Sequence, residues 1–528
     1  MAEHRVVLGD NGQVCALGTW STHCDVSDAI GRWYPRFNTD AQHKGPYKRL
    51  MIMVSVIRSA LTLSLALVLT ACSQDTAKPI DLAIHNVTLI DAVNPIRTNR
   101  TVLIDQGRII AIINSDAAHD ITAAQQVDGS GQYLIPGLWD FHVHFTFDAR
   151  FTDSMAGLFL YHGVTNVRDT GGLLEDLLPV VDTLRSAGAK APSIWYSGPL
   201  LDGADVVYDG VNFPGLGIAN PTPEAARANI AEIHAAGASF LKIYEMVTPE
   251  VFAAIVDEAR TRNLPIDGHV PLSMRARDVA PQVQSLEHLR NYEMDCVSDP
   301  ELWLAARQQA LANPANEPGN VVRSRLHALQ RLTAITNEDP SVCAETTKAL
   351  KATVTVPTLR MNSMDLYVPF AREDFDRAMD LIPASVKEDW IAARDKLAAS
   401  QQPVDTTFAE WSLRRTGELH AAGAPIAAGT DTPIGWSIPG YSLHTELEQY
   451  VEVGMTPLEA LHAATVKPAE YFGLEKEMGQ LKTGFIADAV LLKGNPAENI
   501  AKTRGVAAVI NRGELLLRKQ LDDLITAD

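Results

Sequence analysis

The chain has 528 residues, of which 46% are hydrophobic and 21% charged, and its formal net charge at pH 7 is -19. This length is enough to bury a large core and allows two domains. The acidic excess, with no basic cluster interleaved with aromatic residues, argues against a nucleic acid partner and against electrostatic binding to an anionic membrane.

The first 72 residues differ from the rest. Residues 1–50 are rich in Gly, His and Arg and have no sustained period of 2 or 3.6. A basic residue, Arg58, then precedes an apolar segment that is too short to span a bilayer and that ends in small residues before Cys72, which is typical of a secretion signal. We predict a signal peptide at 51–72 and expect translation to begin near its first residue, leaving 1–50 outside the native protein.

The end of this signal, Leu69-Thr70-Ala71-Cys72, resembles the bacterial lipobox, in which the cysteine is acylated and becomes the mature N-terminus. In Gram-negative lipoproteins a serine such as Ser73 after that cysteine favours the outer membrane. We therefore expect an exported protein, anchored at Cys72 and facing the periplasm, whose lipid is its only membrane contact. The alternative is a chance apolar helix that ends in cysteine.

Of the five cysteines, two lie in residues 1–50 and one is the expected lipid attachment. Cys296 and Cys343 remain as an even pair in an oxidising compartment. This arrangement predicts a disulfide between them.

Both ends of the remaining chain alternate as short strands separated by glycine turns. Asp105-Gln106-Gly107 separates two such strands as a hairpin turn, and a similar pattern returns after residue 484. Two end segments of the same type predict one β-sandwich, built from residues 79–136 and 475–528.

Between the ends, strand and helix patterns alternate, which predicts an α/β fold with parallel strands and crossover helices. After a first strand that ends at His144, further strands are predicted at Val164–Arg168, Ser193–Ser197, Phe240–Tyr244, Pro265–His269, Ser285–His288, Thr353–Thr358 and Pro425–Asp431. Eight strands close a (β/α)8 TIM-like barrel, here over residues 137–474. Helical insertions at about 290–352 and 365–420 are of the kind that roofs an active-site face.

Ionisable residues gather at the ends of these strands. His142 and His144 alternate with Val143, so both imidazoles point to the same side of the first strand, which is half of a metal site. Alone they fit two surface histidines equally well. The fourth, fifth, sixth and eighth strands end in four further candidates, Lys242, His269, His288 and Asp431. Singly these are a snorkelling lysine or a turn aspartate, but together they would converge at the C-terminal mouth of one barrel.

These motifs resemble the amidohydrolase superfamily, and more narrowly its binuclear-metal branch of prolidase-type Xaa-Pro dipeptidases and imidazolonepropionase-like hydrolases. The resemblance runs from about residue 83 to the C-terminus and includes the motifs Pro-Gly-Leu-Trp-Asp-Phe-His142-Val-His144, Lys242-Ile-Tyr, Gly-His269-Val, Glu-His288, Ala-Gly-Thr-Asp431 and the later Gly454-Met-Thr-Pro-Leu-Glu-Ala-Leu-His462. The long insertions and the lipoprotein leader depart from the family pattern.

The resemblance implies two divalent metal ions, most simply zinc. His142, His144 and Asp431 would hold one ion, His269 and His288 the other, and a carbamylated Lys242 would bridge them. It further implies a bridging hydroxide that attacks a carbonyl, with Asp431 passing the proton to the departing amine.

The expected reaction is hydrolysis of the amide bond of a small molecule, a dipeptide or an N-acyl amino acid. Tyr244, two residues past Lys242, is a candidate to bind substrate, as are Arg360 after the seventh strand and His444. Each of the three also has an ordinary structural reading. Cleavage of a cyclic amide, lactone or phosphotriester is the alternative reaction. A binding lipoprotein is the alternative of another class, although a binding module would need neither Lys242 nor Asp431.

The leader generates the first testable prediction. Because the apolar segment ends in a lipobox-like sequence, Cys72 is expected to be acylated and residues 1–71 to be absent from the mature protein. Incorporation of a fatty-acid analogue should be lost in Cys72→Ala. A mature N-terminus upstream of Cys72 would show the prediction to be wrong.

Overall fold

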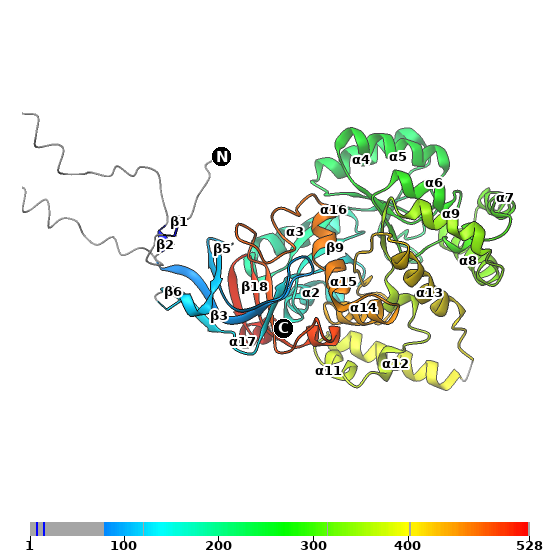
Figure 1. Cartoon of the computed structure of the whole chain (residues 1–528). Coiled ribbons are helices and arrows are strands. Elements are labelled where there is room, and N and C mark those ends of the chain that lie inside the picture. The colour runs from blue at the N-terminus through cyan, green and yellow to red at the C-terminus, as the bar shows by residue number, and fades with distance from the viewer. Residues whose placement is uncertain are drawn as a thin grey trace, which may run out of the picture. The chain divides into compact units, whose positions relative to one another are not determined.

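The structure is a computed structural model that describes residues 79–119, 121–313, 315–400 and 403–525, together with two short paired strands, β1 (Val7–Leu8) and β2 (Val14–Cys15) (Figure 1). The chain divides into two compact units, residues 1–79 and 80–528. The predicted signal peptide and Cys72 lie outside the described residues. No helix in the described ranges combines the length and apolar character that crossing a bilayer requires.

Strands from both ends of the second unit form one mixed sheet. Its strands are β3 (Ile80–Leu89), β4 (Arg97–Asp105), β5 (Arg108–Asn114), β6 (Ala123–Asp128), β7 (Tyr133–Pro136), β17 (Ala489–Leu492), β18 (Val506–Asn511) and β19 (Glu514–Leu517). The order is β19-β18-β17-β7-β3-β4-β5, with β6 also pairing with β3. Strands from both ends of the unit thus pair in one sheet, as predicted, while a second layer that would make it a sandwich stays a prediction.

The hairpin between β4 and β5 shows why the local sequence folds this way. Gln106 and Gly107 have φ angles of 50° and 76°. Two consecutive residues with positive φ make the turn that matches the twist of a two-residue hairpin, and glycine adopts such an angle without strain. The predicted turn is confirmed, and it pairs Asp105 with Arg108.

The middle of the chain forms two parallel sheets. One has the order β10-β9-β8 and the other β12-β11-β13-β14-β15-β16. Their strands are β8 (Leu138–Val143), β9 (Val164–Asp169), β10 (Ser193–Tyr196), β11 (Leu200–Asp202), β12 (Gly217–Ala219), β13 (Leu241–Ile243), β14 (Ile266–Gly268), β15 (Ser285–Glu287) and β16 (Val354–Val356). The α/β class and seven of the eight predicted strands are confirmed.

The eighth predicted strand, Pro425–Asp431, is a correction. Among the described residues this segment makes only isolated parallel bridges, from Ile426 to Thr355 and from Thr432 to Val143. Asp431 has a φ angle of 60°, which is incompatible with an extended strand. The backbone therefore turns at the residue whose carboxylate the site uses.

Helices lie around the parallel sheets, apart from α17, which packs against α2, β18 and β19 (Figure 1). They are α2 (Ala149–Tyr161), α3 (Leu174–Ser186), α4 (Pro223–Ala235), α5 (Pro249–Arg262), α6 (Ala276–Val279), α7 (Pro300–Leu311), α8 (Gly319–Thr336), α9 (Pro340–Leu350), α10 (Leu359–Asn362), α11 (Phe375–Met379), α12 (Ala384–Ser400), α13 (Thr407–Ala421), α14 (Tyr441–Glu452), α15 (Pro457–Ala463), α16 (Val466–Tyr471) and α17 (Arg518–Ile525). In the described ranges six 3-10 turns complete them: Ser115–Ala117, Gly188–Lys190, Ala280–Gln282, Glu293–Asp295, Pro369–Ala371 and Ile500–Arg504. Apolar faces of these helices and strands share one large core, to which Leu158, Ile243 and Leu447 belong.

The start of α15 follows its sequence signals. Thr456 accepts a hydrogen bond from the backbone N–H of Glu459, whose carboxylate accepts in return from the N–H of Thr456. Pro457 occupies the first turn, where its missing N–H costs nothing. The capping box fixes where the helix begins.

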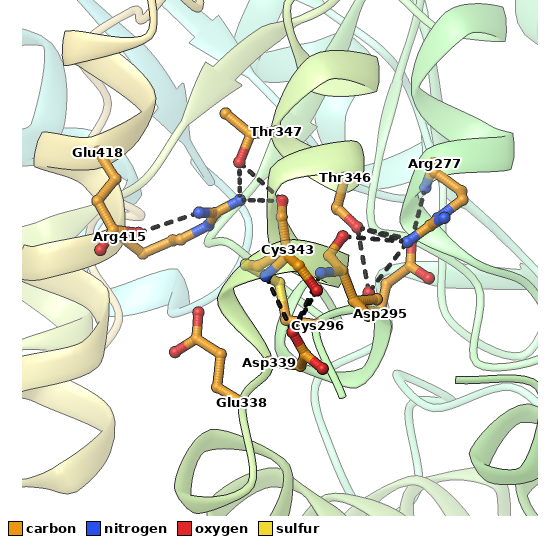
Figure 2. The surroundings of a disulfide bond; sticks show 12 residues. Arg277, Asp295, Cys296, Glu338, Asp339, Cys343, Thr346, Thr347, Arg415 and Glu418 are labelled. Carbon is orange, nitrogen blue, oxygen red and sulfur yellow. Dashed lines mark hydrogen bonds and ion pairs between the residues drawn. A yellow bond between two sulfur atoms is a disulfide. The ribbon is translucent and has the colours of Figure 1, made fainter. Parts of the chain in front are cut away.

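The first insertion contains α7, α8 and α9, and a disulfide joins its two ends. Cys296 and Cys343 are bonded, with Cα atoms 4.2 Å apart and a sequence separation of 47 (Figure 2). Asp339, before α9, donates its N–H to the carbonyl of Cys296 over 2.7 Å. The disulfide ties α9 of the insertion to the loop that follows β15, and both cysteines are buried.

The disulfide generates the second prediction. In the chain-entropy account, opening a loop of this length lowers the free energy of unfolding by roughly 4 kcal/mol. The double variant Cys296→Ser, Cys343→Ser should show this loss in chemical denaturation of the chain that starts after Cys72. Two free thiols, counted on that protein after non-reducing denaturation, would contradict the pairing.

Candidate metal centre

All six predicted metal ligands line one small buried cavity of about 100 Å³. They come from the ends of β8, β13, β14 and β15 and from the segment after Ile426, and none is more than 5% exposed. The six residues are His142, His144, Lys242, His269, His288 and Asp431. The structure thus brings together side chains that lie up to 289 positions apart in the printed sequence.

Asp431 lies at the centre of one half of the cluster. Its Oδ1 is 3.2 Å from Nε2 of His142 and 3.2 Å from Nε2 of His144. The ring of His288 lies 4.5 Å from that of His142, between centroids, and 4.9 Å from that of His269. His142, His288 and Asp431 offer ligand atoms within 4.8 Å of one another, which is the spacing of groups that share an ion.

All four histidines are held at Nδ1. The partner is a carboxylate for two of them, Glu287 for His142 and Glu245 for His269, the latter at 2.8 Å. For His144 it is the carbonyl of Gly171 at 3.2 Å, and for His288 the hydroxyl of Thr358 at 2.7 Å. Carboxylates and carbonyls accept only, so the Nδ1 atoms that face them carry the proton. In those three rings Nε2 is then left with its lone pair, as a metal ligand requires. A hydroxyl both donates and accepts, so the bond to Thr358 orients the ring of His288 without selecting its tautomer.

Burial keeps most of these imidazoles neutral. Desolvation lowers the pKa of His142 and of His269 to about 3, and it lowers the pKa of His288 well below its ordinary value. Burial acts in the same direction on His144, but hydrogen bonding and charge from Asp431 outweigh it and raise that pKa. Burial would raise the pKa of Asp431, yet its electrostatic interactions with His288 and His142 and its hydrogen bonds with His142 and His144 hold it well below its usual range. The donor set of neutral nitrogens and an ionised carboxylate fits a divalent metal such as zinc.

Lys242 is paired with a carboxylate in this structure. Its Nζ lies 3.0 Å from Oδ2 of Asp267 and 3.9 Å from Oε1 of Glu287. Both carboxylates also face the guanidinium of Arg168, at 3.7 Å and 2.5 Å. Lys242 therefore belongs to a buried charge network behind the histidines, and its role as a bridging ligand stays a prediction.

Sequence reasoning assigned no role to Asp267, Glu287 or Glu245. The signal was present, since two of them precede a predicted histidine ligand, in Asp267-Gly-His269 and Glu287-His288. Alternation along a strand would send Glu287 and His288 to opposite faces. A φ angle of 57° at His288 breaks that alternation and lets both side chains reach the cluster.

Asp140 fixes the segment that carries Asp431. Its Oδ1 accepts from the N–H of Thr430 over 3.0 Å, and its Oδ2 accepts from the hydroxyl of Thr430 over 2.6 Å. Burial raises the pKa of Asp140 to about 7. The side chain thus holds Thr430, the neighbour of a site residue, rather than lining the cavity.

Only one of the three predicted substrate-binding residues lines this cavity. Tyr244 does, with its ring 4.6 Å from that of His269. Arg360 instead donates to the carbonyls of Ile434 and Gly435 and lines a separate cavity of about 370 Å³.

His444 lies on α14, one side chain among many that face the core. It is fully buried between the hydroxyl of Thr503, at 2.9 Å, and the carbonyl of His162, at 3.0 Å. The prediction that His444 and Arg360 bind substrate in this cavity is therefore wrong. Both lie near the predicted strand ends in sequence, but their side chains bond backbone carbonyls and a hydroxyl elsewhere.

Three polar residues of the cavity were missed by sequence reasoning: Tyr208, Arg290 and Arg323. Tyr208 lies between β11 and β12, Arg290 follows β15, and Arg323 lies on α8 of the first insertion. No motif marks any of them. The expectation that an insertion covers the site agrees with the position of Arg323.

Known proteins resemble this chain in sequence and in structure. Residues 407–516 match the model of the Amidohydrolase family. The ochratoxinase of Aspergillus niger is 24% identical over 465 residues, which cover 77% of this chain and 79% of that enzyme. The imidazolonepropionase of Symbiobacterium thermophilum is 36% identical over 108 residues, 20% of this chain and 24% of that enzyme. A crystal structure of a Xaa-Pro dipeptidase with bound methionine is similar with a TM-score of 0.58 at 19% identity, covering 83% of this chain and 99% of that one. The resemblance to the amidohydrolase superfamily is confirmed, and these relatives support a hydrolase.

The held Nδ1 atoms generate the third prediction. The variant Thr358→Val removes the hydroxyl that bonds Nδ1 of His288 and keeps a side chain of nearly the same shape. Removing such a partner of a ligand costs about 10- to 100-fold in metal affinity, measured by competition with a chelator.

Thr355→Val is the matched control, since Thr355 is a buried threonine whose hydroxyl bonds none of the four histidines. Equal zinc affinity of the two variants would show that the hydroxyl of Thr358 does not orient a ligand.

Proposed function

We propose, from the resemblance to the amidohydrolase superfamily as premise, that the chain is a binuclear metal-dependent hydrolase that cleaves the amide bond of a dipeptide or an N-acyl amino acid. The observation that carries the proposal is the set of four imidazoles, each held at Nδ1, around one buried carboxylate. His142, His144 and Asp431 would hold one ion, and His269 and His288 the other. Bound zinc would polarise a carbonyl and lower the pKa of water to roughly 7.

Asp431 is the residue we propose to move the proton. Its Oδ1 faces His142 and His144, while its Oδ2 lies 4.0 Å from Nδ1 of His288. Oδ2 would take a proton from the attacking water and deliver it to the nitrogen as the carbon–nitrogen bond breaks. The products are a carboxylic acid and an amine.

Lys242 is proposed to bridge the two ions as a carbamate, formed when its neutral amine adds carbon dioxide. Its place supports this, because its charge lowers the pKa of both His142 and His269, which belong to the two proposed ion sites. The pairing of Nζ with Asp267 describes the unmodified side chain. An anionic carbamate would move away from that carboxylate and toward the ions.

We also propose that the two parallel sheets are arcs of one (β/α)8 barrel. The isolated bridges at Ile426 and Thr432 connect β16 to β8 through the eighth segment. On the other side, Ser239, just before β13, donates its N–H to the carbonyl of Tyr196 in β10 over 2.8 Å. A barrel would place the cluster at the C-terminal ends of its strands, where such folds hold their sites. Location at the outer membrane, facing the periplasm, is proposed from the sequence alone.

Substitution of Lys242 generates the fourth prediction. Lys242→Ala should lose activity and bind zinc poorly, and short carboxylic acids should restore part of both by replacing the carbamate. Lys242→Arg should not function, because a guanidinium stays cationic beside two dications. The measurements are metal content of the purified chain and turnover across a panel of dipeptides and N-acyl amino acids. Near-normal turnover by Lys242→Arg, with two metals per chain, would contradict the proposal.

A further inference from the structure

One side of the catalytic cavity carries polar groups that the hydrolysis proposal does not use. The cluster of six residues forms one side, and Tyr208, Tyr244, Arg290 and Arg323 also line the cavity. The remaining walls are apolar and consist of Leu200, Leu216, Met361 and Ile434. Whatever binds there must satisfy two guanidinium groups and two phenols beside an apolar surface.

The cations of the cavity differ in whether they have a partner. Lys242 is paired with Asp267 at 3.0 Å, and Arg323 with Glu245 at 3.1 Å. Arg290 forms no ion pair or side-chain hydrogen bond with any described residue, and its Nε is buried without a partner.

An unpaired guanidinium is expensive at a partly buried position unless a ligand supplies the opposite charge. Arg290 is only partly exposed, and its charge lies close enough to the cluster to lower the pKa of His269 and of His288. The planar fork of its donors matches a carboxylate, which it can bind through two parallel hydrogen bonds.

The carboxylate of Glu245, which bonds His269 of the cluster, is already occupied by other groups. Its Oε1 accepts from Nδ1 of His269 and from Arg323 on α8, and its Oε2 lies 2.6 Å from Nε2 of His327 on the same helix. Three partners therefore occupy Glu245. The insertion thus leaves Arg290 as the free cation of the cavity.

We infer that Arg290 is the specificity residue that binds the free carboxylate of the substrate. The enzyme would then select amides that carry a free carboxylate and a small apolar side chain. This inference rests on the proposed function and names its substrate class. The cavity of about 100 Å³ limits the apolar part to a small side chain. Neutral amides, lactones and phosphotriesters lack the group that Arg290 would bind.

The test compares, on the metal-loaded chain, two probes of nearly the same shape, N-acetyl-L-alanine with a terminal carboxylate and N-acetyl-L-alaninamide with a neutral terminal amide. Acetate release should favour the acid by roughly 100-fold in kcat/KM, the scale of a charge pair left without its partner. In Arg290→Gln, KM for the acid should rise by about that factor, while kcat/KM for the amide and the metal content stay unchanged.

Two further variants separate anchoring from folding. Arg290→Lys keeps the charge and should retain part of the preference for the acid. Arg325→Gln removes a cation on α8 that pairs at the surface with Glu317, and it should change nothing. Equal use of both probes by the wild type, or an unchanged preference in Arg290→Gln, would overturn the inference.

Calorimetry with the same probes distinguishes this inference from the hydrolase proposal. If neither probe releases acetate, but N-acetyl-L-alanine binds the wild type and not Arg290→Gln, the anchor stands and the proposed hydrolysis fails. If the acid neither reacts nor binds, the anchor is overturned as well.

Discussion

The site depends on one constraint: each of the four buried imidazoles must be held at Nδ1 so that Nε2 faces the cavity. Buried histidines without partners would be free to rotate or to take either tautomer. Here Glu287, Glu245, Thr358 and the carbonyl of Gly171 each fix one ring. These partners come from different strands and loops, so the donor set exists only when the parallel sheets are assembled.

A second consequence concerns charge. Glu287 and Asp267 are fully buried, and each would be costly without a compensating cation. Arg168 supplies it, donating also to the carbonyl of Phe141 over 2.6 Å and to the hydroxyl of Ser285 over 2.9 Å. The guanidinium lies 3.7 Å from the centre of the Phe141 ring. Arg168 thus ties β9 to β8 and β15, and it pairs with the carboxylate of Glu287, which stands behind His142.

Much of this could be predicted from the sequence, because strand ends carry the ligands and strands have a clear pattern. His142, His144, Lys242, His269, His288 and Asp431 were found that way. Residues that act by holding a ligand were not predicted. In sequence, Glu245 and Glu287 look like ordinary acidic residues at strand ends, and only the structure shows that they bond His269 and His142. No sequence motif marks Arg290 or Arg323. Arg290 lies in the irregular loop after β15, and Arg323 reaches the cavity from α8 of the first insertion. Arg360 and His444 show the opposite error, in which a suitable side chain near the mouth is drawn away by local partners.

The central claim is that four Nε2 atoms and Asp431 hold two ions in one cavity. Anomalous diffraction at the zinc absorption edge, on crystals of the zinc-loaded chain, tests it most directly. The account predicts two peaks inside the cavity, one beside Nε2 of His142 and His144 and the other beside Nε2 of His269 and His288. A single peak, ions bound through Nδ1, or zinc only outside the cavity would contradict it.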